Sequence, residues 1–478
     1  MIKVYIKKIF YRLWNSPTFT SWGSFLAQTT SFFLVLPLVL KTFEVEEVTL
    51  WYLFSMVISL QYLADFGFKN TFSRAISFAM GGKTEITVIN EQNNNENIKE
   101  NNWNLVGDII GNARIIYFRI SVFVFVSLAV FGNIALYHNL VSVKDTLSAA
   151  IAWAIIIFTS TIKFYGSIYE FYLLGTNNVA LVKRWEALSF LGSSITNFIV
   201  ILWQGTLLSL VISSQVWVLF DVFRNRTLSR YLYDGRFRLF KSKKLDKKLF
   251  KSIWQAAWKS GIASIMNMGL VNLTGVIYAQ IGNIESVASY LLSLKVLNTI
   301  RNVSMAPFYS KLPLFATLRA KGNIRELKNK AKFGMQLSHW VFVLLCVGVG
   351  LFVNPILQII HSKTPFVTPL IWSLLALAYF FHRFGAMHIQ LYMTTHHVIS
   401  HVADTVSGVI FLLVSVLLVN YLDIMAFPIG MIVGYLGFYC WYSAKYSYNS
   451  INEKFFEYEV KVAFGPFICL ALYFIFIL

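Results

Sequence analysis

A single lysine in the middle of an apolar segment is the residue best placed to do chemistry in this sequence. Lys295 lies within Glu285–Val303, and Asn298, Thr299 and Asn302 follow it at spacings that put all four on one face of a helix. A lysine at the centre of a membrane-spanning helix costs about 2.5–3.5 kcal/mol, and such residues usually face a cavity. Its ammonium and the nearby amides could bind a phosphate. Alternatively it could snorkel, which would require a climb of about 12 Å.

Two other apolar segments carry polar stripes with helical spacing. Such stripes either hydrogen-bond to neighbouring helices or line a water-filled cavity, and the sequence leaves both interpretations open. Because the two segments would begin matching halves of the molecule, we take Gln28 and Asn267 as candidate substrate-binding residues in a cavity. The first stripe is Ser21, Ser24, Gln28 and Ser31, and the second is Ser260, Ser264, Asn267 and Thr274.

Other charged residues lie near the ends of the apolar segments. Arg74 and Lys311 follow the second and eighth segments at matching positions. They could meet a phosphate at the cytoplasmic mouth of a cavity, or they could only set the topology. Arg119 and Arg383 allow either snorkelling or function. Three acidic residues could carry a proton or pair with local cations, namely Asp65, Glu186 and Asp404.

No catalytic or cofactor motif accompanies these residues. The sequence has no Walker loop, no nucleophile elbow and no metal-ligand spacing. We therefore expect neither an enzyme nor a bound cofactor or metal. The three cysteines, Cys346, Cys440 and Cys469, lie in apolar segments, so we expect them to pack rather than to form disulfides.

The composition predicts the elements that hold these side chains. Hydrophobic residues make up 57% of the chain and charged residues only 13%, whereas soluble domains carry about 25% charged residues. Apolar segments near 20 residues long recur, which is the length of a membrane-spanning helix. We predict an all-α integral membrane protein with twelve spans, or thirteen if Val462–Ile477 also spans. The twelve are Trp22–Leu40, Val48–Ala64, Ile115–Ile134, Leu147–Tyr165, Trp185–Trp203, Leu207–Phe223, Trp254–Gln280, Glu285–Val303, Gln336–Leu357, Pro369–Phe384, Val402–Tyr421 and Met425–Tyr442.

The basic residues are distributed unevenly between the two sides of the predicted membrane. With a cytoplasmic N-terminus, 35 of the 41 Lys and Arg fall on the inner side, three in outer loops and three within spans. This asymmetry is the positive-inside pattern of multi-pass membrane proteins. The net charge of +19 is therefore explained by topology and by attraction to membrane lipids, and we expect no nucleic-acid partner.

The two halves of the chain resemble each other. Tyr52-Leu-Phe-Ser55 in the second span matches Tyr290-Leu-Leu-Ser293 in the eighth. Parallel repeats of this kind are a transporter architecture with the substrate site where the repeats meet. We predict two pseudo-symmetric six-helix lobes around a central cavity. The domains are an N-terminal lobe over 1–223, a basic cytoplasmic linker over 224–253, a C-terminal lobe over 254–445 and a tail with an optional extra membrane helix over 446–478.

Two stretches resemble a known family. The residues from Trp51-Tyr-Leu-Phe54 through Leu63-Ala-Asp-Phe-Gly-Phe68 to Arg74-Ala-Ile-Ser77 are similar to the second helix and following loop of Wzx-type O-antigen and capsular polysaccharide flippases. Tyr172-Leu-Leu-Gly-Thr-Asn177 with Val182-Lys-Arg184 resembles their next inner loop. The resemblance implies the multidrug/oligosaccharidyl-lipid/polysaccharide exporter superfamily. It also implies export of undecaprenyl-diphosphate-linked oligosaccharides across the bacterial inner membrane, for surface polysaccharide and lipopolysaccharide synthesis.

Two other functions stay open at this point. An ion-coupled multidrug exporter would want an acidic residue in its cavity, yet the first and seventh spans contain none. A membrane polysaccharide polymerase or ligase would want a sizeable outer loop, which the predicted topology lacks. Without an ATP motif, transport would draw on a gradient of H⁺ or Na⁺, or on that of the substrate.

Overall fold

The computed structural model describes residues 14–81, 101–203, 205–240, 245–264, 266, 270–320, 322–395 and 397–477. Every regular element within these residues is helical. The chain divides into two compact units, Met1–Gly261 and Ile262–Leu478. The prediction of an all-α protein built of two lobes is confirmed.

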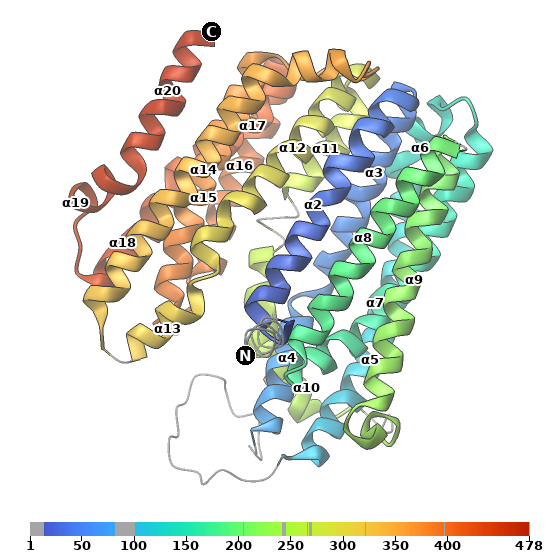
Figure 1. The fold of residues 1–478 in the computed structure, drawn as a ribbon, viewed down its shortest axis with the longest axis vertical. Coiled ribbons are helices and arrows are strands. Elements are labelled where there is room, and N and C mark those ends of the chain that lie inside the picture. Colours follow the sequence, from blue (N-terminus) through green and yellow to red (C-terminus); the bar gives the residue numbers. More distant parts are fainter. Residues whose placement is uncertain are drawn as a thin grey trace, which may run out of the picture. The chain divides into compact units, whose positions relative to one another are not determined.

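The first unit begins with a long helix, α2 (Pro17–Thr42), which packs along α8 (Val179–Trp203) (Figure 1). Polar side chains start several of its helices by capping the free N–H groups of the first turn. Asn102 accepts from the N–H of Leu105 at 3.0 Å, for example. The other elements are α3 (Val45–Gln61), η1 (Tyr62–Asp65), α4 (Phe68–Met80), α5 (Trp103–Ser127), η2 (Leu128–Gly132), α6 (Asn133–Ser142), α7 (Thr146–Gly175), α9 (Leu207–Tyr231), η3 (Tyr233–Arg238) and α10 (Lys247–Ser264).

The second unit is organised around α15 (Pro369–Met393), the most buried of its candidate membrane helices. It packs against α18 (Cys440–Ile451), α17 (Ala426–Gly434) and α14 (Ile324–Ile359) (Figure 1). The remaining elements are α11 (Leu270–Ile281), α12 (Ile284–Tyr309), α13 (Leu312–Ala320), α16 (Ser400–Leu422), η5 (Asp423–Met425), η6 (Tyr435–Tyr439), α19 (Phe455–Glu459), η7 (Val460–Phe464) and α20 (Gly465–Ile477).

Nine helical stretches in the described part of the chain are long and apolar enough to cross a membrane. Phe455–Ile477 is one of them and contains the predicted thirteenth span, while Ser400–Ile451 contains both the eleventh and the twelfth. The second span lies in α3 and η1, the eighth lies in α12, and neither is among the nine. The protein is therefore a multi-pass integral membrane protein, and the count of twelve stays a prediction.

The predicted basic linker is largely helical. Helix α9 continues through Tyr231 instead of ending at Phe223, and α10 begins at Lys247. Arg224 explains this continuation, because its guanidinium is buried and donates to Asp221 at 2.7 Å and to Ser189 at 3.0 Å. A buried charge is tolerated when it is paired and hydrogen-bonded, so these contacts allow the helix to continue beyond its apolar part.

Two glycines allow α16 and α17 to approach closely in the second unit. A Cβ added at Gly430 would lie 2.3 Å from the Ser415 hydroxyl oxygen, and one at Gly434 would lie 2.5 Å from the carbonyl oxygen of Ser407. Small residues four apart are a common device for packing membrane helices. The Ser407 contact is the stricter one, since a backbone carbonyl cannot rotate away.

We expect Gly434→Ala to destabilise the second unit by about 1–3 kcal/mol, because the added methyl group overpacks this contact. The measurement is the thermal unfolding of purified protein in one detergent. Gly437→Ala is the matched control, since a Cβ there meets nothing within 4 Å. Equal unfolding temperatures for both variants would show that α16 and α17 do not pack as the structure places them.

Candidate functional site

Helix α12 carries Lys295 and is positioned by clear local signals. The Asn283 side chain caps its first turn by accepting from the N–H of Ser286 at 2.8 Å. Glu285 adds a negative charge in that turn, which favours a helix N-terminus. The helix then runs without a break to Tyr309, so Lys295 lies three turns from its start.

The two parts of α12 differ in their burial. From Val287 to Leu294 every residue is buried, and Tyr290 packs among Tyr278 and Phe427. Beyond Leu294, one face of the helix is accessible. Lys295 and Asn302 are exposed, and Thr299 between them is half-buried. The helical face predicted from the sequence is therefore accessible, and it begins at the lysine.

Lys295 stands out from its immediate surroundings. Its neighbours Leu294 and Val296 are buried, whereas its own side chain is exposed. Within the described residues, no carboxylate lies within ion-pair distance of its ammonium. An unpaired cation at mid-helix retains its full capacity to bind an anion.

The amides on this face have different roles. Asn298 is half-buried, and its side-chain oxygen accepts from the Tyr379 hydroxyl of α15 at 3.4 Å. Asn302 is exposed and therefore accessible to a ligand. Arg301 adds a second positive charge nearby, with its guanidinium 5.9 Å from the centre of the Tyr379 ring. The arrangement can hold an anion, and it offers no nucleophile paired with a base.

Arg383 corrects one sequence-based interpretation. Snorkelling is wrong for this residue, because its side chain is completely buried in the middle of α15. Its guanidinium donates to the carbonyl oxygens of Ser338 at 2.8 Å and Ser304 at 3.2 Å, and lies 4.6 Å from the Phe342 ring centre. Arg383 thus ties α12, α14 and α15 together. Only its position within an otherwise apolar span could have signalled this burial.

The structure describes the α2 stripe more fully than the second polar stripe. On α2, Ser24 is buried while Gln28 is exposed, so that stripe is not a uniformly packed helix contact. Asn267 lies outside the described residues. Of its stripe, Thr274 is buried on α11 and lies 3.2 Å from the Tyr290 hydroxyl. A cavity-lining role for Gln28 and Asn267 stays a prediction.

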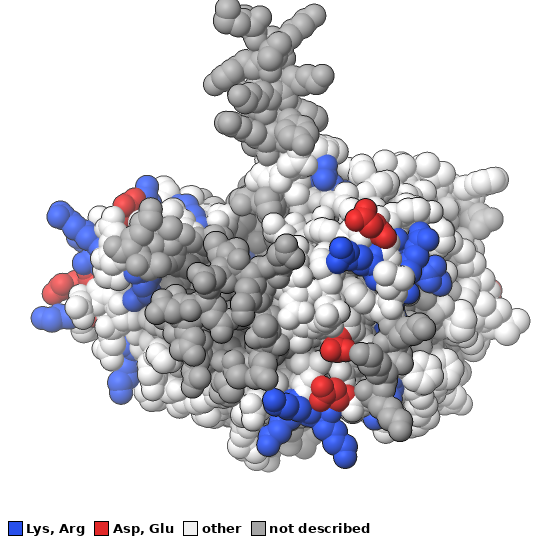
Figure 2. Space-filling view, turned by 90° about the horizontal axis from the view of Figure 1, so that it is seen from below, with Lys and Arg blue, Asp and Glu red and all other residues white. Residues whose placement is uncertain are grey.

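The two cations predicted at the inner ends differ in their settings. Arg74 is exposed on α4, a helix with one buried and one open face. Lys311 follows α12 and is half-buried, with its ammonium 4.9 Å from the Phe333 ring centre. Figure 2 shows Lys and Arg gathered in several clusters on the face of the molecule seen from below.

The candidate proton carriers in the first unit have local partners. Asp65 accepts from the Tyr117 hydroxyl at 2.5 Å and from the N–H of Lys69 at 3.0 Å. Glu186 pairs with Lys183 at 2.6 Å. Asp404 of the second unit is buried in α16. Pairing with a local cation was one of the two interpretations that the sequence left open for these residues. The contact of Glu186 with Lys183 agrees with it, whereas Asp65 accepts from a hydroxyl and a backbone N–H.

Several solved structures of transporters are similar to this one. An inward-facing multidrug resistance MATE family transporter of the MOP superfamily matches with a TM-score of 0.65 and 13% identity, over 89% of this chain and 94% of that one. An outward-facing MATE transporter matches with a TM-score of 0.58 and 11% identity, over 92% and 97%. The chain has the MATE transporter fold.

A third similar structure is a MOP superfamily transporter from Pyrococcus furiosus, with a TM-score of 0.62 and 12% identity over 92% of this chain and 97% of that one. It is described as having a binding pocket of reverse polarity that suggests a different function. No protein-family model matches the sequence, and a comparison with curated proteins gives no match. At these identities the MATE likeness establishes the fold alone.

Proposed function

We propose that this protein is a flippase that moves undecaprenyl-diphosphate-linked oligosaccharides outward across the bacterial inner membrane. The observation that carries this proposal is Lys295, an accessible lysine in the middle of α12 without an acidic partner among the described residues. A pyrophosphate supplies the counter-charge that this ammonium lacks. In this proposal the protein is a transporter, not an enzyme, and needs no cofactor.

The fold supports alternating access as the mechanism. Structures of this fold include both inward-facing and outward-facing conformations. Opening to each side in turn lets a polar headgroup cross while its lipid tail stays in the membrane. Arg74 and Lys311 would meet the pyrophosphate at the cytoplasmic mouth, and Gln28, Asn267, Asn298 and Asn302 would contact it or the sugars. A gradient of H⁺ or Na⁺ would drive the cycle.

The charge of the accessible helix face supports a lipid-linked oligosaccharide, rather than a cationic drug, as the transported substrate. The Pyrococcus furiosus transporter is described as having a pocket of reverse polarity and a different function, so one fold is described with more than one pocket polarity. In this chain the accessible face of α12 carries the cation Lys295, and Arg301 adds a half-buried positive charge on an adjacent side of the same helix. A cationic face repels organic cations and attracts a diphosphate. Drug export remains the alternative, because MATE transporters of this fold are described as multidrug resistance proteins.

The direct test is complementation in a bacterium that lacks its own flippase but makes the lipid-linked oligosaccharide. We expect expression of this chain to restore surface polysaccharide and to leave resistance to a cationic dye such as ethidium unchanged. Raised dye resistance without any polysaccharide would reject the flippase proposal in favour of drug export. Several donor strains are needed because the sugar specificity is set by pocket shape.

Topology gives an independent prediction. With the native cysteines replaced, Lys144→Cys should react with a membrane-impermeant thiol reagent in intact cells, because its loop is predicted to face outward. Arg238→Cys should react only after the cells are permeabilised. Both side chains are exposed, so access to the reagent depends on the side of the membrane. Labelling of Arg238→Cys in intact cells would overturn the predicted topology.

A further inference from the structure

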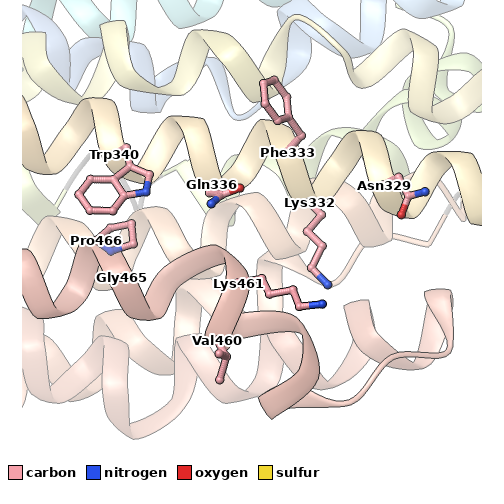
Figure 3. Close-up of a pocket in the computed structure, with 9 residues that line it drawn as sticks. All are labelled: Asn329, Lys332, Phe333, Gln336, Trp340, Val460, Lys461, Gly465 and Pro466. Atoms are coloured by element: carbon pink, nitrogen blue, oxygen red, sulfur yellow. The ribbon is translucent and has the colours of Figure 1, made fainter.

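A second cationic site lies in the second unit, away from Lys295. A pocket of about 520 Å³ opens where α14 meets η7 and α20. Figure 3 shows Lys332 of α14 and Lys461 of η7 directing their ammonium groups toward the same space. Asn329, Gln336 and Trp340 of α14 complete the polar side of its lining. We propose that this pocket binds the headgroup of an anionic phospholipid.

The two ammonium groups are available for such a ligand. Lys332 is held in place because it donates to the carbonyl oxygen of Glu457 at 3.4 Å and lies 4.9 Å from the Tyr458 ring centre. An ammonium has three donors, so others remain. In the described part of the chain, neither Lys332 nor Lys461 has a carboxylate within ion-pair distance. Lys328, one turn earlier, is neutralised by Glu453 at 2.5 Å. The pocket therefore concentrates positive charge that no described carboxylate neutralises.

The position of the pocket along α14 matches the membrane interface. The first turns of this helix are rich in charge, and its apolar part begins near Leu337. Trp340 lies just beyond this change, and tryptophan is enriched at the level of lipid headgroups. The positive-inside assignment puts this end of α14 on the cytoplasmic side. Basic pockets between membrane helices on that side are known to bind anionic headgroups.

The surroundings favour a lipid over a free phosphate ion. The lining also includes exposed apolar side chains, namely Phe333 and Val460, which are 59% and 57% exposed. Further into the apolar part, Leu344 of α14 and Leu472 of α20 are also exposed. Acyl chains attached to the bound headgroup would cover these side chains. A free phosphate would contact only the lysines and amides, whereas a phospholipid would contact both these groups and the apolar side chains.

Binding can be tested without any transport assay, so the outcome does not depend on the proposed function. The full-length protein is delipidated in an uncharged detergent and titrated with phosphatidylglycerol, with phosphatidylcholine of the same acyl chains, and with inorganic phosphate. Bound lipid is counted by native mass spectrometry, and unfolding temperature is followed in parallel. We expect phosphatidylglycerol to bind at least tenfold more tightly than phosphatidylcholine, since two lysines favour the anionic headgroup. Inorganic phosphate should not reproduce the stabilisation.

Variants test whether the preference for phosphatidylglycerol over phosphatidylcholine arises in this pocket. Lys332→Gln with Lys461→Gln should abolish the tenfold preference. Lys461→Gln alone, which removes an exposed side chain, should reduce it about fivefold and tests the site even if the double variant folds poorly. Lys330→Gln is the matched control, because Lys330 is exposed on the same helix but does not line the pocket. It should keep the wild-type preference.

Four results would overturn the inference. Equal binding of the two phospholipids would show that headgroup charge is not recognised. Stabilisation by phosphate alone would make the site one for a free anion. An unchanged preference in Lys461→Gln and in the double variant would place the lipid elsewhere. Tighter binding of a short-chain polyprenyl diphosphate than of phosphatidylglycerol would also reject a membrane phospholipid as the occupant.

Discussion

Replacing Lys295 with methionine should reduce polysaccharide export ten- to hundredfold. Methionine is similar in length but neutral, so it removes the charge while filling much of the same space. Losing a charge-assisted contact costs about 1.5–3 kcal/mol, which corresponds to that range of effect. Lys295→Arg should retain much of the export, because a guanidinium also binds phosphate oxygens. The measurement is surface polysaccharide per cell, normalised to the amount of the protein in the membrane.

The position of Lys295 in the structure simplifies the interpretation of the Lys295→Met and Lys295→Arg variants. Lys295 is exposed, so methionine there adds no strain to the buried part of α12. Helix insertion should become easier without the charge. A failure of membrane insertion would therefore not explain reduced export. Lys144→Met is the control, since Lys144 is exposed in a predicted outer loop. Wild-type export by Lys295→Met would reject the pyrophosphate role and leave the lysine as a snorkelling residue.

Features that repeat along the sequence were predictable. Apolar segments of membrane-spanning length define the helices, because a helix that crosses the lipid must be predominantly apolar over about 20 residues. The matched tyrosines Tyr52 and Tyr290 lie buried in the first and second units respectively. The shared polar face of α12 also follows from spacing, since Lys295, Thr299 and Asn302 must lie on one side of any helix. Cys346 and Cys440 are buried free thiols, as their apolar surroundings predicted.

Features that depend on distant partners were not predictable. Helix α9 extends beyond its predicted end because Arg224 meets Ser189, 35 residues earlier in the chain. Arg383 is buried because the carbonyl oxygens of Ser304 and Ser338 lie within its reach. Periodicity gives the side of a helix on which a residue lies, but it does not say which other helix faces that side. Charged residues in apolar segments were therefore assigned least well.

The C-terminal segment also depends on contacts between residues far apart in the sequence. We expect the loss of one of them to have a large effect on stability. Glu459 of α19 is buried, and its carboxylate accepts from the Tyr448 hydroxyl at 2.7 Å and lies 3.1 Å from His388 Nε2. It therefore joins α19 to α18 and α15. We expect Glu459→Ala to lower the free energy of unfolding by about 3–5 kcal/mol, because it leaves two buried polar groups without a partner. The measurement is thermal unfolding together with protease resistance of the C-terminal segment.

Two neighbouring variants separate the loss of this contact from a general effect of mutating α19. Glu457→Ala removes an exposed carboxylate from the same helix and keeps the backbone carbonyl that Lys332 contacts, so it should change stability by less than about 0.5 kcal/mol. Glu459→Gln retains an oxygen that can accept from Tyr448, and its stability should fall between those of the wild type and Glu459→Ala. If Glu459→Ala were no less stable than Glu457→Ala, the contacts to Tyr448 and His388 would not hold α19 in place. The C-terminal helices would then be retained by apolar packing of η7 and α20 against α14 and of α20 against α15.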